Sequence, residues 1–145
     1  MPICDVCNKE LSPVFYVLTT TQVMTSEAYW QLVFTIIKEI DPEGKSLMNY
    51  IKKLASSSTG WAICEDCIRL FNVDRNVASE YANKAKSSKS FKDYRPPGGG
   101  PADLPTVAST AAKAWKKLYG KWPKSIVVVT TDKDRRNVID LVEKL

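Results

Sequence analysis

At 145 residues the chain is long enough to bury a hydrophobic core, as one domain or as a small metal-stabilised domain with a short appendage. Its apolar fraction of 44% and charged fraction of 26% are near the averages for globular proteins, which excludes a wholly disordered, collagen-like or membrane-embedded class. The net charge of +5 hides an uneven distribution of charge along the chain.

The sequence indicates a protein without a membrane segment or a secretory leader. Its longest apolar runs are far shorter than the roughly 20 residues that a membrane helix needs. The first ten residues, MPICDVCNKE, lack the basic and apolar regions of a signal peptide. We therefore expect a cytoplasmic protein, and in that reducing compartment paired cysteines more often hold a metal than form a disulfide.

The first predicted elements are a strand and two helices. Residues 14–25, VFYVLTTTQVMT, are rich in β-branched and aromatic types and predict a strand. From Ser26, a predicted N-cap, apolar residues follow the helical period up to Ile40, where Asp41-Pro42 ends the helix. A second helix is predicted over residues 46–55, and the two helices would form an antiparallel hairpin.

The rest of the chain predicts a strand at 60–64, a continuous helix at 64–86 and a helix, strand, helix segment at the end. Residues 87–105 are rich in Pro, Gly and Ser and predict a linker. After it we expect a helix that begins at Thr106 and ends at Gly120, a buried strand over KSIVVVTT and a closing helix. The predicted regions are a zinc-binding region (1–86) with a helical insertion at about 26–55, a linker (87–105) and a basic α/β segment (106–145).

The four cysteines form two CxxC pairs, Cys4 with Cys7 and Cys64 with Cys67, and the chain has no histidine. Zinc favours four tetrahedral ligands, and two such pairs complete its shell with thiolates. A closed shell leaves no position for a substrate or a catalytic water. We therefore predict one structural Zn²⁺ per chain.

A pair in a tight knuckle, CDVCNKEL, followed by a pair where a strand meets a helix, GWAICEDCIRLF, resembles the treble-clef or zinc-ribbon class of Cys4 zinc fingers. The resemblance covers the two pairs and their flanks, and it implies an α+β fold: a treble-clef-like zinc core with an inserted helical hairpin, followed by a C-terminal helix-strand-helix segment. The chain departs from the class because 56 residues separate Cys7 from Cys64, where the connecting hairpin is normally short.

A redox-active dithiol and free thiols are the alternatives to zinc. Trp61 precedes Cys64 and Cys67 at a strand-to-helix junction, as in a thioredoxin-like site. However, Glu65 and Asp66 place two negative charges between the thiols, which opposes thiolate formation. A dithiol site would also leave the first cysteine pair unexplained.

A basic block extends from Lys84 to Lys124. It has ten basic residues and two acidic ones, a net charge of +8, whereas the rest of the chain carries −3. Such a block attracts phosphate backbones or acidic protein surfaces, although a solvated linker and helix face have the same composition. Among nearby aromatic residues, Trp115 is predicted to be core, whereas Trp122 and Tyr94 remain open for stacking on bases. The candidate nucleic-acid contacts are Lys84, Lys86, Lys89, Lys92, Arg95, Lys113, Lys116, Lys117, Lys121 and Lys124.

No catalytic constellation stands out in the sequence. Asp132, Asp134, Arg135 and Arg136 follow the predicted strand 124–131, where α/β proteins often bind ligands, but solvated charges next to a helix cap explain them as well. We therefore predict a non-enzymatic zinc-binding protein with a protein- or nucleic-acid-interaction surface. The alternatives are an enzyme with a site on the C-terminal α/β part and a CxxC thiol redox protein.

Overall fold

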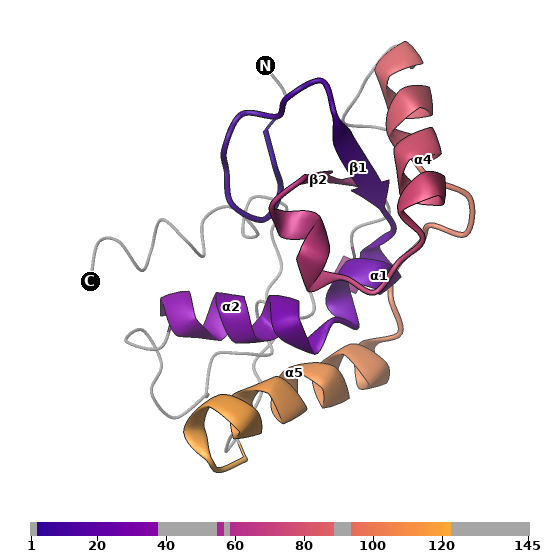
Figure 1. Cartoon of the computed structure of the whole chain (residues 1–145). Helices are drawn as coiled ribbons and strands as arrows, with labels where there is room; N and C mark the ends of the chain where they lie inside the picture. The colour runs from indigo at the N-terminus through magenta and orange to yellow at the C-terminus, as the bar shows by residue number, and fades with distance from the viewer. Residues whose placement is uncertain (1–2, 38–54, 57–58, 89–93, 123–145) are drawn as a thin grey trace.

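The computed structural model describes residues 3–37, 55–56, 59–88 and 94–122. Within these ranges the chain forms helices and a small two-stranded sheet, an α+β arrangement (Figure 1). The elements in chain order are β1 (Phe15–Leu18), α1 (Thr20–Met24), α2 (Glu27–Ile37), β2 (Trp61–Cys64), the 3-10 helix η1 (Cys67–Leu70), α4 (Arg75–Ser87) and α5 (Leu104–Tyr119).

The sheet joins two strands that are far apart in the sequence. β1 and β2 run antiparallel, with Phe15 opposite Cys64 and Leu18 opposite Trp61. An isolated bridge between Ile3 and Glu10 closes the loop that precedes β1. α4 lies along β1 (Figure 1). The start of β1 and the end of β2 therefore lie together, and both cysteine pairs are close to them in sequence.

The strand predicted over residues 14–25 is wrong from Thr20 onward, where the chain forms α1. The Thr19 hydroxyl accepts a hydrogen bond from the Gln22 amide, and the Gln22 side chain accepts one from the Thr19 amide. This capping box satisfies two amides that would otherwise be unpaired at a helix start. It also lets the short helix bury Val23 and Met24, so the cap and the burial outweigh the β-propensity of the threonine run.

α2 begins where the sequence predicts. The Ser26 hydroxyl accepts from the Tyr29 amide (3.2 Å) and donates to the Leu70 carbonyl (2.7 Å), so it caps the helix and ties it to η1. The predicted helix end at Ile40 and almost all of the second predicted helix, 46–55, lie outside the described residues. Ala55, the one residue of that helix that is described, is helical, as is the Ser56 that follows it.

The continuous helix predicted over 64–86 is instead two helices, η1 and α4. Phe71 between them is extended and buried, and the Asp74 carboxylate caps α4 by accepting from the amides of Asn76 and Val77. The buried face of α4 consists of Ala78, Ala82 and Ala85. These small side chains suit close packing on β1.

α5 has the predicted C-terminal end. Gly120 takes a left-handed conformation (φ 74°), which suits glycine, and its amide donates to the Lys116 carbonyl. The helix begins at Leu104, where Asp103 accepts from the Thr106 amide. α5 packs against α2 (Figure 1). The strand and closing helix predicted after Lys124 lie outside the described residues.

Aromatic side chains connect the sheet, α2 and α5 into one core. Tyr29 contacts Trp61 of β2 edge to face (6.0 Å between ring centroids). Phe34 stacks on Trp30 (5.5 Å) and contacts Trp115 of α5 edge to face (5.4 Å). Trp115 is 1% exposed, which confirms its predicted place in the core.

The described part of the Pro/Gly-rich segment contacts the residues around β2. The Gly60 amide donates to the Tyr94 carbonyl, and the Ala102 amide donates to the Ala55 carbonyl, both at 2.7 Å. A β-carbon at Gly60 would lie 2.7 Å from Val17 Cγ1, so glycine allows this close approach. The division into regions 1–86, 87–105 and 106–145 stays a prediction. In the part of the chain that the structure describes, no helix has the length and apolar character needed to cross a bilayer.

Candidate metal centre

The first cysteine pair lies in a tight loop before β1. The Cys4 amide donates to the Lys9 carbonyl (2.8 Å), and the Asn8 amide donates back to the Cys4 carbonyl (3.0 Å). Asn8 has a φ of 63°, a left-handed conformation that asparagine tolerates better than most residues. These bonds fold residues 4–8 into the knuckle that the sequence predicts.

The second pair lies where β2 ends. Cys64 is the last residue of β2, and Cys67 is the first residue of η1. The sequence predicts a long helix that begins at Cys64, and the partial positive charge at the start of such a helix would favour thiolates at this pair. The structure has only the four-residue η1 here, and Asp66 forms no side-chain cap, so the dipole contributes less than expected.

The structure brings the four predicted ligands together. The Sγ atoms of Cys4, Cys7, Cys64 and Cys67 all lie within 4.8 Å of one another, and those of Cys7 and Cys64 are 3.8 Å apart. A tetrahedral ion with metal–sulfur bonds of about 2.3 Å separates its ligands by about 3.8 Å. The four thiols are not paired as disulfides. The cluster therefore suits a metal ion held by four thiolates.

Hydrogen bonds concentrate negative charge on Cys4. Its Sγ accepts from the amides of Val6 and Cys64, each at 3.4 Å. A hydrogen bond from the Cys67 thiol, together with these backbone amides, lowers the pKa of Cys4 to about 5. The same hydrogen bond to Cys4, followed by burial, raises the pKa of Cys67, and burial raises the pKa of Cys7. One thiolate is thus favoured before a metal replaces the remaining protons.

The sequence reasoning missed Asp5, which is buried between the first two cysteines. The Asp5 amide donates to the Ala62 carbonyl, and Asp5 Oδ2 accepts from the Ala62 amide, both at 2.8 Å. The one signal that could have drawn attention to it is an acidic residue between the two cysteines of a CxxC pair, next to the apolar Val6.

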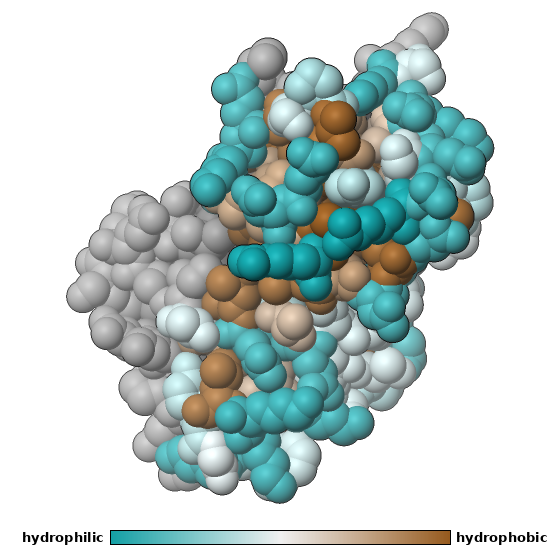
Figure 2. Space-filling view, viewed as in Figure 1, coloured by the Kyte–Doolittle hydropathy of each residue, from teal (hydrophilic) through white to brown (hydrophobic). Residues whose placement is uncertain are grey.

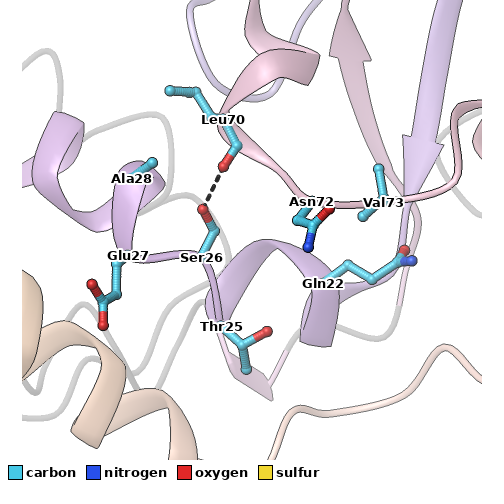
Figure 3. A pocket seen from close by; sticks show the side chains of 8 residues that line it. All are labelled: Gln22, Thr25, Ser26, Glu27, Ala28, Leu70, Asn72 and Val73. Carbon is cyan, nitrogen blue, oxygen red and sulfur yellow. Dashed lines mark hydrogen bonds between the residues drawn. The ribbon is translucent and has the colours of Figure 1, made fainter.

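A separate hollow of about 400 Å³ lies between the α1–α2 junction and the chain after η1 (Figure 3). Three of its polar side chains are already bonded within the chain: Ser26 donates to the Leu70 carbonyl, Thr25 to the Thr21 carbonyl, and Glu27 pairs with Lys117. Its lining contains no cysteine and only one carboxylate. We therefore do not place the functional site there.

The helical residues of the basic block that the structure describes belong to two separate helices. Lys84 and Lys86 belong to α4, beside β1, whereas Lys113, Lys116 and Lys117 belong to α5, on the far side of α2 (Figure 1). Hydrophilic side chains cover parts of both regions (Figure 2). Arg95 and Lys121 are exposed outside these helices.

Several candidates lie outside the described residues. These are Lys89, Lys92, Lys124 and the acidic and basic residues Asp132, Asp134, Arg135 and Arg136. The proposed enzyme site on the C-terminal part therefore stays a prediction.

No protein-family model, curated protein or solved structure matches this chain. The function must therefore be inferred from the chemistry of its own residues.

Proposed function

We propose that the chain is a non-enzymatic zinc-binding protein in which one structural Zn²⁺, bound by Cys4, Cys7, Cys64 and Cys67, stabilises a surface that binds another macromolecule. The observation that carries this proposal is the position of four Sγ atoms within 4.8 Å of one another. Four thiolates fill the tetrahedral shell and leave no site for a reactive water, so the metal acts as a scaffold. Reducing conditions, as in the cytoplasm, would keep these thiols available for metal.

The order of elements supports a treble-clef-like core. A knuckle carries the first pair, the antiparallel strands β1 and β2 follow, and the second pair lies at the junction of β2 with η1. The difference from the resembled class is the connection between the strands, which here contains α1 and α2. These helices supply part of the core, so the insertion would enlarge a zinc core that is small by itself.

Elemental analysis of freshly purified protein, beside a thiol titration under native conditions, tests the metal. We expect about one zinc per chain and four unreactive thiols, because bound thiolates are protected. If the protein contains iron in place of zinc, the four-thiolate scaffold stands and only the identity of the ion changes, because thiolate ligands suit both metals. Protein without metal, with reactive or disulfide-linked cysteines, would favour the redox alternative and contradict the proposal.

We further propose single-stranded nucleic acid as the partner, bound by the α5 basic surface, defined as Lys113, Lys116, Lys117, Lys121 and Trp122. All five residues are exposed, and α5 buries its opposite, apolar face against α2. Trp122 is 54% exposed, with the Lys116 ammonium 4.5 Å from its ring centroid. Lysines that reach phosphates beside an aromatic ring that can stack on bases are the ingredients of single-strand binding. Glu27 partly neutralises Lys117, so the other three lysines carry more of the proposed attraction.

Fluorescence anisotropy with a labelled single-stranded oligonucleotide, at several salt concentrations, tests the partner. The double variant Lys113→Ala/Lys121→Ala should bind more weakly and lose about 1.4 from the slope of log K against log salt, because each single-strand phosphate contact contributes about 0.7. The matched control is Arg69→Ala/Arg75→Ala, which removes the same charge from exposed positions in η1 and α4 and should leave the slope unchanged. Equal loss in both variants would indicate unspecific attraction, and no binding by the wild type would leave an acidic protein as the partner to test.

A further inference from the structure

We propose that Asp5 is the positioning residue of the metal centre: it docks the first cysteine pair onto β2, so that the four thiols are assembled before a metal binds. The inference rests on the proposed function, because it treats the four thiols as a metal site. It concerns a residue that does not itself ligate the metal.

Asp5 and Ala62 exchange two hydrogen bonds. The Asp5 amide donates to the Ala62 carbonyl, and the Ala62 amide donates to Asp5 Oδ2, both at 2.8 Å. Asp5 is 9% exposed and Ala62 is 4% exposed, so water competes little for these bonds. Two residues of an antiparallel pair exchange bonds in the same way, except that a carboxylate oxygen here replaces the second backbone carbonyl.

This exchange determines where the knuckle lies on the sheet. Ala62 also faces Val17 of β1 in the strand register, and its amide and carbonyl both bond to Asp5. In an antiparallel sheet, alternate residues direct these groups toward and away from a given neighbour. β2 therefore lies between β1 on one edge and the Asp5 loop on the other.

The cysteines are placed by the same contacts. Asp5 directly follows Cys4, and Ala62 precedes Cys64 by two residues. A third bond, from the Cys64 amide to Cys4 Sγ at 3.4 Å, links the same two segments. Because these bonds involve no metal, they can hold one cysteine of each pair in place in the metal-free chain. A metal then binds to an arranged cluster instead of having to bring the two segments together.

The carboxylate is the replaceable part of this arrangement. Alanine at position 5 would keep the backbone bond to Ala62 and leave the buried Ala62 amide without its acceptor. Asparagine would keep an acceptor oxygen at nearly the same place. Loss of a group that orients metal ligands typically weakens metal binding by about 10- to 100-fold.

The test measures metal affinity by chelator competition, with Co²⁺–thiolate absorption as the spectroscopic readout, on the full-length reduced protein. We expect Asp5→Ala to weaken Co²⁺ and Zn²⁺ binding by about 10- to 100-fold and Asp5→Asn to restore most of the affinity. The matched control is Asp103→Ala, which also removes a carboxylate that accepts from a backbone amide, but at the start of α5. It should lower stability and leave metal affinity unchanged.

Three outcomes would overturn the inference. They are an unchanged metal affinity in Asp5→Ala, a loss of affinity in Asp5→Asn equal to that in Asp5→Ala, or the same loss in Asp103→Ala, which would show a general effect of stability.

If Asp5→Ala does not fold, amide hydrogen exchange in the metal-free wild-type protein is measured instead. We then expect slow exchange at Ala62, and fast exchange there within an otherwise protected β2 would overturn the inference. Metal binding by the wild type is measured before any variant is compared. If the wild type binds no metal, the proposed function itself is wrong.

Discussion

Trp30 of α2 and Trp115 of α5 are both buried, and they differ in whether the indole nitrogen has a partner. The Trp30 indole donates to the Met24 carbonyl at 2.7 Å. In the part of the chain that the structure describes, Trp115 Nε1 has no hydrogen-bond partner. Both rings contact Phe34 at similar centroid distances, 5.5 Å and 5.4 Å, so each residue is a control for the other.

We expect Trp30→Phe to reduce the free energy of unfolding by about 1–3 kcal/mol more than Trp115→Phe. Both substitutions remove similar ring volume, but only the first deprives a buried carbonyl of its donor. Guanidinium unfolding of the two variants and the wild type measures the difference. Equal losses would mean that packing alone decides the cost at both sites.

At single positions, the sequence revealed chemistry that a residue type carries by itself. Thiols in two CxxC pairs indicated a shared metal site because no cysteine was left over. The role of Asp5 could not be predicted, because it depends on Ala62, which is remote in sequence and becomes a neighbour only when the knuckle docks on β2. The identity of Asp5 alone is equally typical of a solvated loop.

At the scale of elements, the capping box at Thr19 explains why a threonine-rich segment forms a helix. We expect Thr19→Ala to reduce the free energy of unfolding by about 1 kcal/mol, because the amide of Gln22 loses its acceptor. Chemical denaturation measures this loss. The control is Thr25→Ala, whose exposed hydroxyl donates to a carbonyl of α1 and should matter less. A larger loss in the control would contradict the role of the cap.

A helix boundary was predictable where an apolar stripe meets a local start or stop signal. Ser26 and Gly120 mark the observed start of α2 and the observed end of α5, because each acts on its own neighbours. The errors arose where local signals conflict. Threonines favour a strand until Gln22 completes a cap, and helical spacing continues past Phe71 although Asp74 begins a new helix. The antiparallel pairing of β1 with β2 across the inserted helices is a long-range property that spacing does not encode.

At the scale of the whole molecule, the proposed metal would act on a continuous core. β2 carries Cys64 at its end and Trp61 at its start, and Trp61 contacts Tyr29 of α2. α2 in turn packs on α5 through Phe34 and Trp115. Loss of the arrangement at the cysteines should therefore weaken packing beyond the knuckle itself.

We expect chelation of the metal to lower the unfolding temperature of the wild type, because metal that binds only the folded chain stabilises it by about 2.7 kcal/mol at 100 times its dissociation constant. Thermal unfolding with and without chelator, under reducing conditions, measures this shift. If the chelator removes the metal and the unfolding temperature of the wild type stays the same, the metal does not stabilise the fold.

The decisive comparison combines chelator with Cys7→Ser, which removes one partly buried thiol of the proposed metal site. If the thiol contributes through the metal, the variant should unfold at a lower temperature than the loaded wild type, and chelator should lower it much less than it lowers the wild type. Two effects that share one cause do not add. Ser12→Ala, an exposed substitution in the loop before β1, is the control and should respond to chelator as the wild type does. Additive effects of chelator and Cys7→Ser would mean that Cys7 stabilises the chain by packing and that the metal is held by other groups.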